Sequence, residues 1–121
     1  MPPSTIPMNP DVQPLGMVVA ITRTDVIVFS ISALEGTMRE PRLSLPLTSP
    51  DGPQKLSTLL EDIVKRRWGR QAKRAEHDLD IIVMADPATP MQKILELLGA
   101  VRASPRGTEL FPRVQLSTGF E

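Results

Sequence analysis

A run of four successive apolar residues in the second half of the chain constrains the fold more than any other feature. The run is Ile81, Ile82, Val83 and Met84. A strand that is apolar at every position is covered on both faces, so we expect the segment 80–85 to lie in the interior of a sheet. A helical pattern and then a segment of alternating polarity follow it. These three elements predict a β-α-β unit whose two strands are parallel.

The helix of this unit is predicted by apolar residues spaced three and four apart. They are Met91, Ile94, Leu95, Leu98 and Val101, and we expect them to share the buried face. Thr89 stands just before Pro90 and three residues before Gln92. This pattern favours Thr89 as the cap of the helix.

Another helix is predicted upstream, after the turn-forming residues 48–53. Asp51 or Gly52 can cap it, and Pro53 suits its first turn, where a backbone N–H is not needed. Apolar residues then recur at helical spacing and should form the buried face: Leu56, Leu59, Leu60, Ile63 and Val64. Gly69 provides a helix end, and the alternative is that the helical pattern continues toward Ala75.

The N-terminal half of the chain predicts strands. Two apolar, β-branched runs, 17–21 and 26–31, are separated by a short polar gap and should form an antiparallel hairpin. The segment 43–47 alternates in polarity, but Pro46 restricts it to the edge of a sheet. Residues 1–16 contain five of the 13 prolines, which predicts an extended linker or arm, or a stretch without a role of its own.

Together these elements predict an α+β fold in which two helices pack on a mixed sheet of four or five strands, in the order ββ(β)αβαβ. We expect one domain over residues 17–121, because 121 residues suit a single domain with one modest core. The chain has no cysteine, which excludes disulfides, thiolate metal sites and a cysteine nucleophile. No segment approaches the ~20 apolar residues of a membrane span.

Charge provides one local feature in a chain with 14 basic and 14 acidic residues. Six cations without an intervening acid form a basic run: Lys65, Arg66, Arg67, Arg70, Lys73 and Arg74. Such a run suits contact with phosphates or with an acidic partner. Its alternatives are structural, because cations at a helix end complement the helix dipole and their aliphatic stems can cover Trp68. The rival hypothesis, a cytoplasmic nucleic-acid-binding module, rests on this run, whereas the zero net charge argues against nucleic acid as a partner.

The sequence offers no catalytic or metal-binding constellation, and we expect neither enzymatic activity nor a cofactor. His77 is the only histidine and lies among loop carboxylates, where a metal site would need further ligands at fixed geometry. Asp86 follows a strand, which is a common position for functional side chains in α/β folds. It has no acid or base nearby in the sequence, so we expect it to bind backbone N–H groups in the loop before Thr89.

Residues 79–118 resemble the C-terminal part of the ExbD/TolR family. The resemblance is carried by Asp80-Ile-Ile-Val-Met-Ala-Asp86, by the helical segment 91–101 and by Phe111-Pro-Arg-Val-Gln-Leu-Ser-Thr118. The Pro-rich arm, the hairpin and the Leu-rich helix stand upstream in the family's order, so that the resemblance covers about 100 of the 121 residues. The Pro-rich stretch 32–50 and the basic run depart from the family pattern and leave the partner open.

The resemblance implies the periplasmic domain of an inner-membrane energy transducer. Members of the family carry one transmembrane helix with a proton-coupling Asp, a Pro-containing linker and a periplasmic domain that forms a homodimer. They work with a channel protein of the ExbB/TolQ/MotA type. The proton motive force then drives an envelope partner. This partner is a TonB-like protein, peptidoglycan or the motility apparatus, and the process is biopolymer transport, protein transport or gliding motility. The proton-coupling Asp is not assigned to any residue of this chain.

The closing segment 111–118 is predicted to be a strand because its apolar and polar residues alternate. An edge strand is a template for pairing with a second copy or with an extended peptide. The predicted partner or dimer interface consists of Val114, Leu116, Thr118 and Phe120, which would share one face of the strand. The alternative is that Val114 and Leu116 face the core.

Overall fold

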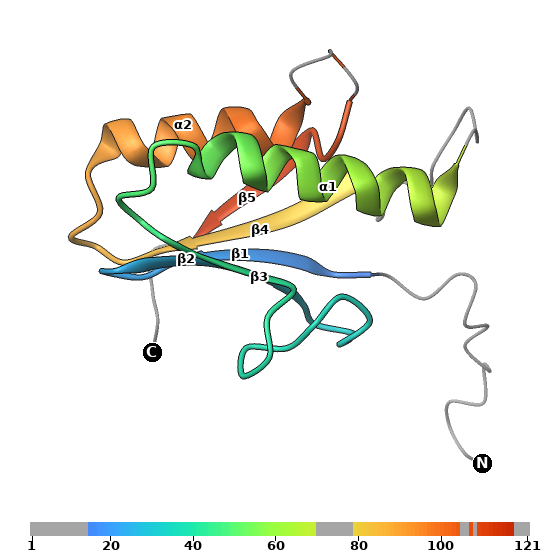
Figure 1. Cartoon of the computed structure of the whole chain (residues 1–121), viewed down its shortest axis with the longest axis horizontal. Helices are drawn as coiled ribbons and strands as arrows, with labels where there is room; N and C mark the ends of the chain where they lie inside the picture. The colour runs from blue at the N-terminus through green and yellow to red at the C-terminus, as the bar shows by residue number, and fades with distance from the viewer. Residues whose placement is uncertain (1–14, 70–78, 105–106, 108, 118–121) are drawn as a thin grey trace.

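The computed structural model describes residues 15–69, 79–104, 107 and 109–117. Its elements are β1 (Met17–Ile21), β2 (Asp25–Ser30), β3 (Leu43–Pro46), α1 (Gly52–Trp68), β4 (Asp80–Ala85), α2 (Met91–Arg102) and β5 (Arg113–Ser117). The strands form one five-stranded sheet in the order β3-β2-β1-β4-β5. Both helices lie side by side on one face of this sheet (Figure 1). The predicted α+β architecture is confirmed, and the optional third strand is present.

The strand directions follow from the connections. β1 pairs antiparallel with β2, and β2 with β3, whereas β4 is parallel to both of its neighbours, β1 and β5. The predicted hairpin and the predicted parallel β-α-β unit are therefore confirmed. β3 lies at one edge of the sheet, where Pro46 is tolerated, and β5 lies at the other. No helix in the described part of the chain is long and apolar enough to cross a membrane.

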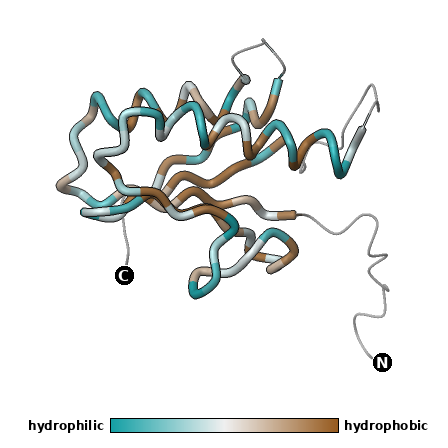
Figure 2. The backbone as a smooth tube through the Cα atoms, viewed as in Figure 1, coloured by the Kyte–Doolittle hydropathy of each residue, from teal (hydrophilic) through white to brown (hydrophobic). Residues whose placement is uncertain are grey.

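The main core lies between the sheet and the helices. In β1, Met17, Val19 and Ile21 face the helices, and Val18 and Ala20 face the other side. Figure 2 shows hydrophobic residues gathered along the strands and on the helix surfaces turned toward them. A smaller apolar cluster lies on the far side of the sheet and consists of Val18, Ala20 and Phe29, with Ile27, Ile82 and Met84 packed against them.

Strand β4 is interior to the sheet, as its apolar run predicts. Ile81 and Val83 are buried beneath the helices. Ile82 and Met84, on the other face, are only partly buried. The expectation of full cover on both faces is therefore wrong for the second face, because both helices pack on the first.

Helix α1 buries the stripe that its sequence predicts. Leu56, Leu60, Ile63 and Val64 are buried, and Leu59 packs against the core in part. Asp51 occupies the cap position without a side-chain cap bond. Its carboxylate instead accepts a hydrogen bond from the Ser49 hydroxyl at 2.7 Å and pairs with Lys55 at 3.5 Å. Gly69 ends the helix, with its N–H bonded to the Lys65 carbonyl oxygen at 3.0 Å.

The predicted buried face of α2 is partly wrong. The buried residues are Ile94, Leu97, Ala100 and Val101. Met91 and Leu95 are instead 63% and 60% exposed. The physical reason is that α1 packs along one side of α2. The buried face of α2 is therefore turned toward α1 as well as toward the sheet, and the side away from α1 is exposed. The predicted cap is also wrong, because Pro90 occupies the cap position and the buried Thr89 hydroxyl oxygen has no hydrogen-bond partner within the described structure.

Candidate partner-binding surface

Strand β5 forms an open edge of the sheet. It pairs with β4 on one side, where an ion pair of 2.9 Å between Arg113 and Asp80 joins the first residues of the two strands. No strand in the described part of the chain pairs with its other side. Such an edge leaves backbone N–H and C=O groups available to a further strand.

Two of the four predicted interface residues lie on this strand. Val114 and Leu116 pair with Ile81 and Val83 of β4, so both point toward the helix side of the sheet. Val114 is partly buried and packs against the core, which agrees with the alternative that it faces the core and not a partner. Leu116 is 48% exposed and remains available for contact. Thr118 and Phe120 lie outside the described residues.

An apolar side of α2 accompanies the β5 edge. It consists of Met91, Leu95 and Leu98, which recur at helical spacing and are called the α2 flank below. The first two are exposed, and the third is partly buried. The opposite side of α2 faces α1, because Ala100 of α2 lines one pocket together with Pro53 and Ser57 of α1. The α2 flank therefore lies on the side of β5 and Leu116. The sequence interpretation placed it in the core and so missed it as a surface.

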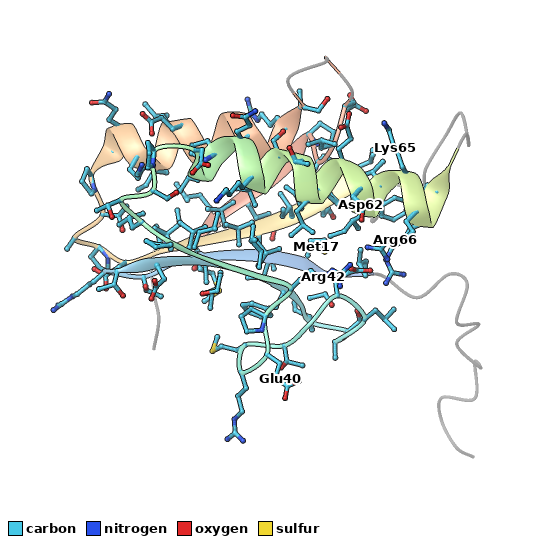
Figure 3. All side chains as sticks on the ribbon, viewed as in Figure 1. Met17, Glu40, Arg42, Asp62, Lys65 and Arg66 are labelled. Carbon is cyan, nitrogen blue, oxygen red and sulfur yellow. The ribbon has the colours of Figure 1, made fainter. Side chains whose placement is uncertain are left out.

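A buried carboxylate in the loop between β2 and β3 binds part of the basic run. Glu35 is 2% exposed. Arg66 donates hydrogen bonds to both of its oxygens, at 3.3 and 3.2 Å, and Arg67 Nε donates to Oε2 at 2.7 Å. Arg42 Nε lies 3.5 Å from Oε1. Glu35 and these three arginines are called the Glu35 cluster below, and Figure 3 shows Arg42 and Arg66 at the end of the molecule where β1 begins at Met17.

The pKa of the Glu35 carboxyl is set by opposing effects. Burial raises this pKa, whereas the hydrogen bonds and positive charges of Arg66 and Arg67 lower it, and the net result lies below the ordinary value of 4.5. The hydrogen bond to Glu35 raises the pKa of Arg66 against the effect of desolvation, with a further contribution from Asp62. At neutral pH the cluster therefore combines one carboxylate with three guanidinium cations, a local positive excess.

The rest of the described basic run is also paired. Lys65 Nζ lies 3.9 Å from Oε2 of Glu61, one helical turn away. Lys65, Arg66 and Arg67 stand in the last turn of α1, where cations complement the helix dipole. Trp68 contacts the ring of Phe111 edge-on, with 6.3 Å between the ring centroids. Arg70, Lys73 and Arg74 lie outside the described residues.

Sequence reasoning did not find Glu35. In the sequence, Glu35 is a single acid beside Gly36, and the basic run contains no acid that would pair with its cations. These two facts are the only indication of a contact between them. Because Glu35 and Arg66 are separated by 31 positions, only the fold brings them together.

Asp86 has the loop role that the sequence predicts. Its Oδ1 accepts the N–H of Ala88 at 2.8 Å, and its Oδ2 lies 3.7 Å from Arg23 Nε. A neighbouring cavity of about 310 Å³, beside Arg23 and the start of α2, has no carboxylate or imidazole in its lining. Within the described residues no group of three acids or histidines could hold a metal ion. His77 lies outside the described residues.

The chain was compared with known proteins at three levels. No protein-family model, no curated protein sequence and no solved structure matches it.

Proposed function

We propose that this chain is the non-enzymatic, partner-binding domain of an ExbD/TolR-type energy transducer, and that it binds its partners through β5 and the α2 flank. In this role the domain lies in the periplasm. The arm before residue 17 tethers it to an inner-membrane helix, which meets a channel protein of the ExbB/TolQ/MotA type. The domain passes work driven by the proton motive force to an envelope partner, which is a TonB-like protein, peptidoglycan or a motility apparatus.

One observation carries the binding part of this proposal. An open strand edge coincides with large apolar side chains that the fold leaves uncovered: Leu116 on β5 and Met91 and Leu95 on α2. An edge strand pairs through its backbone, and neighbouring apolar side chains supply specificity. The family part is supported separately by the residues between 79 and 118 that resemble the family.

A second copy of the chain fits this surface. Antiparallel pairing of β5 with β5 of the copy would place both α2 helices on the same face of one continuous sheet. α2 lies over β4 and β5, so the two α2 axes would be about two strand spacings apart, roughly 10 Å. Packed helices are separated by about 8–10 Å. The two α2 flanks would then bury each other while the strands pair beneath them.

The oligomeric state tests this surface directly. The wild-type chain should sediment as a concentration-dependent dimer. The double variant Leu95→Asp/Leu116→Asp should be monomeric, because it places charge in the middle of the paired apolar surface. The control Met38→Asp changes an equally apolar and exposed residue far from β5 and should stay dimeric. A wild-type chain that stays monomeric up to about 1 mM would rule out the dimer.

The family part has its own test. The reading frame upstream of residue 1 should encode about 20 apolar residues containing an acidic residue. The whole gene product should copurify with the channel protein encoded beside it. An upstream frame without such a segment would overturn the transducer proposal and leave the strand-edge interface to be judged by sedimentation.

A further inference from the structure

The loop between β2 and β3 exposes three large apolar side chains. They are Ile31, Leu34 and Met38, with exposed fractions of 69%, 55% and 55%. The other large apolar side chains exposed in the described part of the chain lie on β5 and α2. Single exposed apolar residues are ordinary, but three within eight positions of one loop favour a contact surface. This loop, residues 31–42, is therefore a surface separate from the β5 edge.

The loop is held in place by its polar and backbone groups. Ile31 N–H donates to the Gly16 carbonyl oxygen at 2.8 Å, and the Ser32 hydroxyl donates to the Leu15 carbonyl oxygen at 2.8 Å. Arg42 N–H donates to the Val28 carbonyl oxygen at 2.7 Å at the other end of the loop. The Glu35 cluster joins its middle to α1. The apolar side chains are thus presented on a preorganised backbone, which lowers the entropy lost on binding.

The arginines beside the loop retain free donor capacity. Arg42 and Arg66 are 46% and 44% exposed although one side of each guanidinium faces Glu35. A guanidinium has five N–H donors; on Arg66, Glu35 accepts from two of them and Asp62 from a third, with 3.4 Å between Arg66 Nε and Asp62 Oδ2, which leaves two. Arg39 adds an exposed cation within the loop. The neighbouring acids Glu40 and Asp62 only partly offset these charges, so this end of the molecule keeps a positive excess. It suits oxyanions such as phosphate.

The position of the loop suggests which phosphate-bearing partner meets it. Figure 1 shows the loop projecting from the sheet on the side away from the helices, and Figure 3 places Arg42 and Arg66 beside Met17, where β1 begins. Under the proposed function, on which this step rests, the segment before Met17 leads to a membrane anchor. The tether would then keep this end at a high effective concentration beside the bilayer.

We propose that loop 31–42 and the Glu35 cluster form a docking surface for an anionic phospholipid bilayer. Ile31, Leu34 and Met38 enter the headgroup layer, and Arg39 together with the exposed donors of Arg42 and Arg66 binds lipid phosphates. Glu35 positions the arginines and does not itself touch lipid. An acidic protein segment would bind the same arginines. A projecting apolar loop, however, inserts more readily into a deformable lipid layer than against an extended protein chain.

Flotation with phospholipid vesicles tests the proposal on the chain as it is. The wild type should bind vesicles rich in phosphatidylglycerol and bind phosphatidylcholine vesicles at least about tenfold more weakly, because the anionic surface attracts the arginines. The double variant Ile31→Ser/Leu34→Ser should lose at least about tenfold in affinity. Arg39→Gln, which leaves the Glu35 cluster intact, should lose about fivefold. Circular dichroism should show all variants folded.

The control is Met91→Ser/Leu95→Ser, which removes equally exposed apolar side chains from the α2 flank. It should float like the wild type even where it has become monomeric. A loop variant that binds as well as the wild type, or a wild type that does not float, would overturn the proposal. Binding to soluble polyglutamate without flotation would overturn it in favour of an acidic protein partner. Because sedimentation reports on β5 and flotation on the loop, failure of one proposal is distinguishable from failure of the other.

Discussion

Glu35 and Arg67, 32 positions apart in the chain, are joined by a hydrogen bond of 2.7 Å between Arg67 Nε and Glu35 Oε2. Together with the bonds from Arg66, it fastens the loop between β2 and β3 to the last turn of α1. Little water reaches the buried carboxylate, so the guanidiniums replace its hydration. The loop is thereby an integral part of the folded domain.

Glu35→Gln should lower the free energy of unfolding by roughly 2 kcal/mol. Removing one partner of a fully buried ion pair costs about 3–5 kcal/mol, and we expect less here because the guanidiniums reach solvent. Urea unfolding measures the change. Glu40→Gln, at an exposed position of the same loop, is the matched control and should change stability by less than about 0.5 kcal/mol. Equal effects of the two substitutions would contradict the structural role of Glu35.

The stabilisation by Glu35 should depend on pH in one direction. Its pKa in the folded chain lies below the ordinary value of 4.5, so the unfolded chain takes up the proton first as the pH falls. The contribution is complete above the ordinary value and is lost as the pH drops through the lower folded pKa. The difference between wild type and Glu35→Gln, measured by urea unfolding, should therefore shrink over the range that starts near the ordinary pKa of 4.5 and extends downward through the folded pKa. A difference that stays constant over this range would argue against the depressed pKa.

Gly36 and Gly99 should respond oppositely to alanine. Gly36 has a φ of +91°, and a Cβ there would lie 2.6 Å from the backbone nitrogen of Arg42. Gly36→Ala should therefore destabilise by roughly 2 kcal/mol through backbone strain. A Cβ on Gly99 meets nothing within 4 Å, and Gly99→Ala should stabilise helix α2 by up to about 1 kcal/mol. Thermal unfolding of both variants gives the comparison, and a neutral Gly36→Ala would refute the loop geometry.

Thr89→Val should leave stability unchanged or raise it slightly. The Thr89 hydroxyl oxygen is buried without a hydrogen-bond partner in the described structure, so removing it relieves a desolvated polar atom. If Thr89 instead capped α2, as its sequence position suggested, the substitution would cost about 1 kcal/mol. Chemical unfolding distinguishes the two outcomes. Thr89→Ser, which keeps the hydroxyl, serves as the comparison.

A single cysteine should report the proposed pairing of β5 with its copy. The chain has no cysteine of its own, so one substitution gives one reactive thiol. Gln115 is the middle residue of β5, and antiparallel pairing centred there would bring the two thiols of Gln115→Cys close enough to form a disulfide. Ser44→Cys on β3, at the opposite edge, is the control. Equal amounts of covalent dimer from both variants under mild oxidation would count against the β5 interface.

The structural elements that depend on near neighbours in the chain could be predicted from the sequence. The β-branched runs form β1 and β2, Pro46 lies on an edge strand, and Asp86 binds the N–H of Ala88 two residues on. The buried stripe of α1 was also predicted. In each case the deciding spacing or bond spans only a few residues.

Other features were decided only by the tertiary structure. In α2, Leu95 and Leu97 both stand at helical spacing from other apolar residues, and the position of α1 determines that Leu97 is buried and Leu95 exposed. Glu35 acquires its role because folding of the sheet brings its loop to the end of α1. The sequence by itself determined the order and local form of the elements, since these follow from backbone preferences and periodicity. Which side chains meet across distant segments was decided by packing, because a residue's burial depends on neighbours that its local sequence does not contain.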